Sequence, residues 1–403
     1  MAERSSVGRL TGLWSRDFVL GLTAYFFLFL SVSLFFLLPL FLKQFRASGS
    51  QVGLIMGIHS LTAIAVRPFF GSMIDRQGGK KISLLGIAIL IFSVPLFHLV
   101  KGAGLIPVLL RALTGIGWGI SMTATITMCT DLAPVQSMAR SIGIVGVAGL
   151  IANAAGPSLG EEIIRRAGFG GLFNCSLVFL LLSFFLVNLT RELPREDRET
   201  DRPGPLSRVP ASTSLVILLI IGSMPVVHGS VRGAMIYFMP LLVKALDLGR
   251  VGPFFVIFSV AAILSRFRLG GLADQFGPKK VVLLSATIIG LNLFLVWQVR
   301  SVAGLWLTGF IGGFGQGLIF PALSTYLIDF LGRENKGLAI SFYNSLFDVG
   351  MGLGSIFYGW VSELAGLRPM YLVAGIILLS FTIIFKIKAP DIRRPDFTRT
   401  EGG

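Results

Sequence analysis

Charged side chains are scarce in this 403-residue chain: Asp, Glu, Lys and Arg make up only 14% of it, against 54% hydrophobic residues. A water-soluble domain carries about a quarter charged residues, because it must cover its core with a wettable surface. The composition therefore argues against a soluble globular protein and favours one that lies in lipid. There, backbone polar groups must be satisfied within the fold, which leaves helices or a closed barrel.

The alternation of polar and apolar residues that barrel strands require is also missing. Apolar runs are continuous, as in residues 25–42, so the sequence predicts an all-α membrane protein. Cysteine occurs only as Cys129 and Cys175, with neither the spacing of a metal site nor a disulfide framework. No phosphate-binding Gly-x4-Gly-Lys-Ser/Thr sequence occurs. We therefore expect a protein that is not an enzyme and uses no metal and no cofactor.

Twelve segments of the chain are apolar and long enough to cross a membrane, which takes about 20 residues. They cover residues 17–42, 51–73, 82–100, 104–128, 138–161, 170–190, 212–243, 251–272, 280–298, 303–329, 336–362 and 367–388. The polar stretch 191–211 divides them equally. We predict two six-helix bundles, residues 1–190 and residues 212–403 with a short tail, joined by a linker at 191–211.

The positive charges, which give a net charge of +15, are unevenly distributed over the loops. In this topology 21 Lys and Arg residues fall on the side of the termini and the linker, and nine fall on the other side. Because cytoplasmic loops are enriched in Lys and Arg, the bias places both termini in the cytoplasm. We expect a monomer in a bacterial inner membrane, with the lipid bilayer and a small-molecule substrate as partners. No nucleic-acid partner is expected, since no soluble domain with a basic face is visible.

An internal repeat runs through the chain. Residues 67–81 and 266–280 share an arginine, two glycines, an aspartate and two lysines at an offset of 199. Residues 115–131 and 313–329 share three glycines and an aspartate at an offset of 198. Agreement at so many equivalent positions predicts parallel structural repeats related by an axis along the membrane normal.

The loop after the second span combines glycine, acidic and basic residues: Gly71, Asp75, Arg76, Gly78, Lys80 and Lys81. Their spacing resembles the loop signature of the major facilitator superfamily, and a weaker copy with Asp274 and Gly277 follows the eighth span. The resemblance covers essentially the whole chain. It implies a twelve-helix fold of two bundles around a central cavity, transport by alternating access, and a gating role for this loop. The alternative is an ordinary basic loop.

The glycines and lysines of this loop each have an expected physical role. Gly71 is expected to let helices approach closely, and Gly78 to permit a tight turn. Lys80 and Lys81 are expected to anchor the loop at the anionic inner leaflet.

Two further segments resemble signatures of the same family. Arg111, in the fourth span, matches an arginine that the family links to proton or substrate coupling. It should face the bundle interior, because a charge facing lipid is costly, although snorkelling to the surface is the alternative. In the fifth span Gly156, Pro157 and Gly160 resemble a motif of proton-coupled exporters, with Ala152 and Glu161 as departures from it. The alternative is a kinked packing helix with no bearing on direction.

Polar residues inside the remaining spans are few: Asn153, His228, Arg232, Gln316, Asn344 and Asp348, with His59 in the second span. Asp348 lies midway along the eleventh span. It is a candidate proton carrier assisted by Arg111 or Arg232, or the partner of a basic group such as Arg232 in a structural salt bridge. Because residues 18–42 contain no acidic residue, a proton site in the first helix is excluded.

The resemblance extends to drug and metabolite:proton antiporters. It implies a secondary transporter that exports a small organic molecule and is coupled to protons. Two alternatives stay open: an uptake permease of the same fold, coupled to protons or another solute, and a non-transporting membrane receptor.

Overall fold

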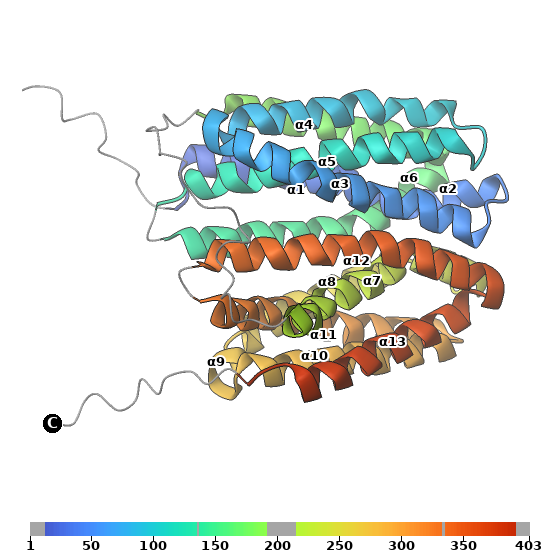
Figure 1. The fold of residues 1–403 in the computed structure, drawn as a ribbon. Helices are drawn as coiled ribbons and strands as arrows, with labels where there is room; N and C mark the ends of the chain where they lie inside the picture. Colours follow the sequence, from blue (N-terminus) through green and yellow to red (C-terminus); the bar gives the residue numbers. More distant parts are fainter. Residues whose placement is uncertain (1–12, 135–136, 192–214, 333–334, 392–403) are drawn as a thin grey trace, which may run out of the picture.

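The computed structural model describes residues 13–134, 137–191, 215–332 and 335–391. In these ranges the chain is helical, and the helices run roughly side by side in two groups (Figure 1). Apart from Arg191, the predicted linker 191–211 lies outside the described residues, as does the end of the C-terminal tail.

The first group holds the helices before the linker. They are α1 (Arg16–Leu34), η1 (Phe35–Leu37), α2 (Leu38–Gln44), α3 (Gly49–Gln77), α4 (Gly79–Ser93), η2 (Pro95–Leu99), α5 (Leu105–Asp131) and α6 (Met138–Leu189). Helix α1 continues through η1 into α2 as one apolar stretch, Arg16–Gln44. Proline at the start of α2 is tolerated there, because the first turn of a helix does not use its backbone N–H groups.

The second group repeats this order after the linker. It consists of α7 (Leu215–Ala245), α8 (Gly252–Leu269), α9 (Leu272–Phe276), α10 (Pro278–Gln298), α11 (Val302–Leu331), α12 (Lys336–Ala365) and α13 (Leu367–Lys388). Across the two groups, α12 packs against α3 and α6 packs against α8.

The twelve predicted spans agree with the helices. Within the described ranges, ten helical stretches are long and apolar enough to cross a membrane. One of them, Arg140–Leu189, has 50 residues and bends at Gly168, so it provides two spans. Helix α12 is less apolar than the others but has 30 residues and is packed between α3 and α7. The chain is therefore an all-α membrane protein, as predicted, and its described residues provide twelve spanning helices.

Glycines with positive φ end helices at equivalent places in the two groups. Gly78 (φ 90°, ψ 151°) separates α3 from α4, and Gly277 (φ 89°, ψ 142°) separates α9 from α10. Gly168 (φ 65°) joins the two halves of α6, and Gly366 (φ 93°) joins α12 to α13. Only glycine adopts such angles without a steric penalty, so the repeat in the sequence is also a repeat of backbone turns.

Close approach of helix backbones explains other glycines. A Cβ atom at Gly229 of α7 would lie 1.9 Å from the Phe347 carbonyl oxygen of α12. A Cβ at Gly350 of α12 would lie 1.9 Å from the Val226 carbonyl oxygen of α7. Lipid gives helices little hydrophobic reason to associate, so such backbone contact is a main source of their packing.

Gly71 behaves differently from our prediction. A Cβ there would meet nothing within 4 Å, so this glycine does not mediate a close helix contact in the conformation described.

Candidate functional site

Buried polar side chains gather where the two groups of helices meet. They come from α3 and α5 of the first group and from α7, α11 and α12 of the second, which pack on one another. A polar group at this depth needs a partner inside the protein, because lipid offers none.

The carboxylate of Asp348 on α12 accepts a hydrogen bond from Nη1 of Arg67 on α3. Both side chains are 17% exposed, so the pair is largely shielded from solvent. It joins the two groups of helices, since α3 and α12 belong to different ones. The expected partner, Arg232, is therefore not the one this structure shows. One signal for Arg67 was available in the sequence: it is a basic residue within a predicted span, at the start of the repeated segment 67–81.

His228 on α7 has partners on two other helices. Its Nδ1 lies 2.9 Å from the Tyr343 hydroxyl of α12, and its Nε2 lies 2.9 Å from Oε1 of Gln316 on α11. Since a carbonyl oxygen can only accept, Nε2 donates to Gln316. The Tyr343 hydroxyl can donate to Nδ1 or accept from it, so both ring nitrogens are satisfied whether the imidazole is neutral or protonated. Tyr343 was not among the predicted residues, because a tyrosine in an apolar span usually indicates packing.

Arg111 and Arg232 lie inside the bundle with 2% and 8% of their surfaces exposed. The Arg111 guanidinium lies 5.8 Å from the Phe35 ring centroid, and that of Arg232 lies 4.7 Å from the Phe258 ring centroid. Among the described residues neither arginine forms a salt bridge, and Nε of Arg111 has no hydrogen-bond partner.

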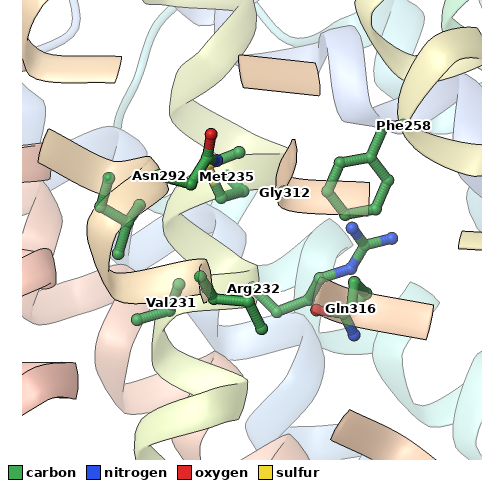
Figure 2. A pocket seen from close by; sticks show the side chains of 9 residues that line it. Val231, Arg232, Met235, Phe258, Asn292, Gly312 and Gln316 are labelled. Atoms are coloured by element: carbon green, nitrogen blue, oxygen red, sulfur yellow. The ribbon is translucent and has the colours of Figure 1, made fainter. Parts of the chain in front are cut away.

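A small cavity lies beside Arg232, between α7, α8, α10 and α11 (Figure 2). Its volume is about 10 Å³, roughly the space for one water molecule. Its polar lining consists of Arg232, Gln316 and Asn292. Asn292 is 1% exposed, and neither its Nδ2 nor its Oδ1 has a hydrogen-bond partner in the described part of the chain. Our sequence analysis did not select Asn292, although an amide in the interior of the apolar segment 280–298 was the available signal.

The other predicted interior residues are more dispersed. His59 on α3 lies 3.3 Å from Oγ1 of Thr114 on α5, within the first group. Asn153 on α6 is 8% exposed, and its Oδ1 has no partner among the described residues. Asn344 is half-buried on α12, one turn before Asp348.

The glycine–proline motif of the fifth span lies where α6 crosses α1. A Cβ at Gly156 would lie 2.0 Å from Oγ of Ser33 on α1. The same Oγ donates a 2.9 Å hydrogen bond to the carbonyl oxygen of Ala152. Pro157 follows within the helix, and Gly160 contacts Leu37. The motif therefore contributes a tight helix crossing.

The two copies of the loop motif make matching contacts. Lys80 donates to the carbonyl oxygens of Asn188 and Thr190 at the end of α6. Lys279 donates to the carbonyl oxygen of Ala389 after α13 and forms a 2.8 Å salt bridge with Asp391, which lowers the pKa of that carboxyl. These lysines bind the C-terminal end of the last helix of each group, where a cation is favourable.

At the opposite end of the molecule, carboxylates join the two groups. Glu161 on α6 accepts hydrogen bonds from the backbone N–H groups of Val251 (2.7 Å) and Gly252 (2.8 Å), at the start of α8. Glu363 on α12 accepts one from the backbone N–H of Ser50 (2.9 Å), at the start of α3. Each carboxylate thus caps a helix N-terminus of the other group, where negative charge is stabilised.

The sequence model of the Major Facilitator Superfamily matches residues 20–265 and 227–402. The chain belongs to this superfamily. The staphylopine export protein of Staphylococcus aureus is 24% identical over 371 residues, which cover 88% of this chain and 91% of the relative. The multidrug resistance protein MdtG of Salmonella choleraesuis is 26% identical over 360 residues, which cover 85% and 88%. The crystal structure of a mutant of the nucleoside transporter NupG has a TM-score of 0.78 at 13% identity, covering 92% of this chain and 99% of that one.

Membership of the Major Facilitator Superfamily makes the chain a transporter and an integral membrane protein, resembling drug:proton antiporters. The predicted resemblance is therefore confirmed. The candidate site of this transporter consists of the Arg67–Asp348 pair, which joins the two groups of helices, the His228 network within the second group, and the two arginines without a salt bridge.

Proposed function

We propose that this transporter exports a small organic molecule in exchange for protons, with both termini on the cytoplasmic side of a bacterial inner membrane. The observation that carries the proposal is the Arg67–Asp348 pair between the two groups of helices. While Asp348 is ionised, the pair draws α3 and α12 together. When a proton neutralises the carboxylate, this attraction is lost and the halves can separate, so proton occupancy can follow the conformational cycle.

The relatives support the direction. The staphylopine export protein and a multidrug resistance protein both align over more than four fifths of this chain. Alternating access would be a rocking of residues 1–190 against residues 212–403, with the linker 191–211 between them.

A vesicle assay tests this function. Everted membrane vesicles containing the protein are acidified, and a pH-sensitive dye reports the interior pH as single organic compounds are added outside. We expect at least one compound to raise the interior pH, because it enters in exchange for protons. Vesicles containing Asp348→Asn serve as the control and should give no response. If compounds that are loaded inside the everted vesicles instead leave them together with protons, the protein is an uptake permease.

We further propose that the loop after α3 controls the cytoplasmic gate. Replacing Asp75 by Asn should reduce flux by about tenfold or more while membrane insertion stays normal, because Asp75 lies at the end of α3 outside the apolar core. Asp274→Asn is the matched control. It should be milder, since Gln275 follows Asp274 where Arg76 follows Asp75. Initial rates in vesicles, normalised to the inserted protein, measure both. Wild-type flux in the Asp75 variant would exclude this role.

A further inference from the structure

The buried charges of the candidate site do not balance. Within the described helices, Asp348 is the one carboxylate near the middle of a span, and Arg67 already occupies it. Arg111 and Arg232 are left without an acidic partner at the same boundary between the halves. A guanidinium remains charged in proteins, so neither can relieve its burial by losing a proton.

The two arginines belong to different groups of helices. Arg111 lies on α5 of the first group, with its guanidinium 5.8 Å from the Phe35 ring centroid, and Arg232 lies on α7 of the second. Next to Phe35, the ring of Phe36 contacts Tyr237 of α7, at 6.4 Å between ring centroids. Tyr237 is 2% exposed, so Arg111 and Arg232 lie near one buried contact between the two groups, on either side of it.

The surroundings of these arginines are built for a polar ligand. The Arg111 Nε and both amide atoms of Asn292 are buried without hydrogen-bond partners in the described residues. Asn292 and Arg232 line the same cavity, and Figure 2 shows the Arg232 guanidinium beneath the ring of Phe258. A buried polar atom without a partner is costly, so these atoms need a partner that the described residues do not supply.

We propose that the exported molecule is an organic anion, and that Arg111 and Arg232 bind its carboxylate or phosphate oxygens from the two sides of the boundary. This rests on the proposed transport function and names its substrate class. The planar guanidinium forks match carboxylate and phosphate oxygens bidentately, and the neighbouring Phe35 and Phe258 offer apolar surface to the organic part. The cavity of about 10 Å³ lies within the second group and is too small for such a molecule. The proposed anion site is therefore the space between Arg111 and Arg232 that opens when the halves separate.

One anion held by residues from both halves would also favour the closed state. Its binding free energy is largest when Arg111 and Arg232 approach it together, so the occupied transporter closes around it. An amine would meet two positive charges at the same place and would be repelled.

A stabilisation screen tests the substrate class on the purified full-length protein. The probes are citrate, glutamate, salicylate and glucose 6-phosphate, each beside an uncharged amide or alcohol counterpart, and a set of organic amines. We expect at least one anion to raise the melting temperature, and its counterpart and the amines to have no effect. Stabilisation by amines or uncharged counterparts alone, or by no anion, would overturn the proposal.

Variants locate the binding site. The apparent affinity for the stabilising anion should fall roughly 10- to 100-fold in Arg111→Gln and in Arg232→Gln, as expected for a lost charge-assisted hydrogen bond. Arg111→Lys and Arg232→Lys keep the charge and should lose less. Arg300→Gln, an exposed arginine after α10, is the matched control and should bind as the wild type does. Wild-type affinity in both glutamine variants would exclude the site.

The outcome separates this inference from the proposed function. If only cationic compounds drive proton exchange in the vesicles, proton-coupled export stands and the anion site is wrong. If anions bind in an arginine-dependent way but no compound moves protons, the substrate class stands and the coupling is wrong. If one glutamine variant elutes as an aggregate, the lysine variant at the same position is measured in its place. Its affinity for the anion should be lower than that of the wild type and higher than that of the glutamine variant at the other position.

Discussion

Flux driven by a proton gradient should fall at least tenfold when Asp348 is replaced by Asn, whereas substrate exchange at equal pH on both sides should persist. Asparagine cannot take up a proton, so the carboxylate that would carry it between the two sides is gone. Exchange needs only the rocking of the halves and no net proton transfer. Both rates are measured on one vesicle preparation loaded with a compound that the screen identifies.

The double variant Arg67→Gln/Asp348→Asn distinguishes a coupling role from a structural one. The single substitution leaves the Arg67 guanidinium buried without its partner, which by itself destabilises the protein. In the double variant that unpaired charge is removed as well. If the single variant fails only because the Arg67 charge is left without its partner, gradient-driven flux should recover in the double variant. If Asp348 carries the proton, the flux stays low, and recovery would contradict the proposed coupling.

The largest loss of stability should come from Gly229→Ala. The added Cβ would lie 1.9 Å from the Phe347 carbonyl oxygen, so α7 and α12 would have to move apart along their contact. Overpacking of this kind costs about 3 kcal/mol or more when backbone atoms are the obstacle. We expect a melting temperature in detergent well below that of the wild type, or loss of the monodisperse peak in size-exclusion chromatography.

Gly143→Ala is the matched control for this substitution. Gly143 also lies within a helix, α6, but a Cβ there would meet nothing within 4 Å. Alanine favours helix over glycine by about 1 kcal/mol, so this variant should melt at or slightly above the wild-type temperature. Equal melting of the two variants would show that the α7–α12 contact does not limit stability.

The sequence allowed the fold to be predicted because hydropathy and loop charge act locally. The number of spans follows from apolar segments of membrane length, and the repeat marks Gly78 and Gly277 as equivalent turns. Burial of Arg111 could also be expected, since a charged side chain in a span has few alternatives. These features depend on neighbouring residues in the chain and on the membrane.

Pairing across the two halves could not be derived in the same way. Helical periodicity shows which residues share a face with Asp348, but the identity of its partner depends on how α3 and α12 are rotated and shifted against each other. Arg67 and Arg232 were equally available from the sequence. Asn292 was missed because an isolated amide within an apolar segment forms no sequence motif. Only the packing of the helices shows that its polar atoms lack partners among the described residues.

The single-glycine turns at Gly168 and Gly366 constrain how each half can move. Each connects the fifth and sixth spans of its half with no intervening loop, so the ends of the two helices are held together at one residue. A loop of several residues would let such helices slide past each other, whereas a single residue keeps their ends at a fixed separation. A tilt of α12, which carries Asp348, must therefore move the start of α13 as well. A movement of α12 at the buried ion pair therefore also displaces the start of α13. The thickness of the surrounding bilayer then favours or opposes the resulting tilt of these helices.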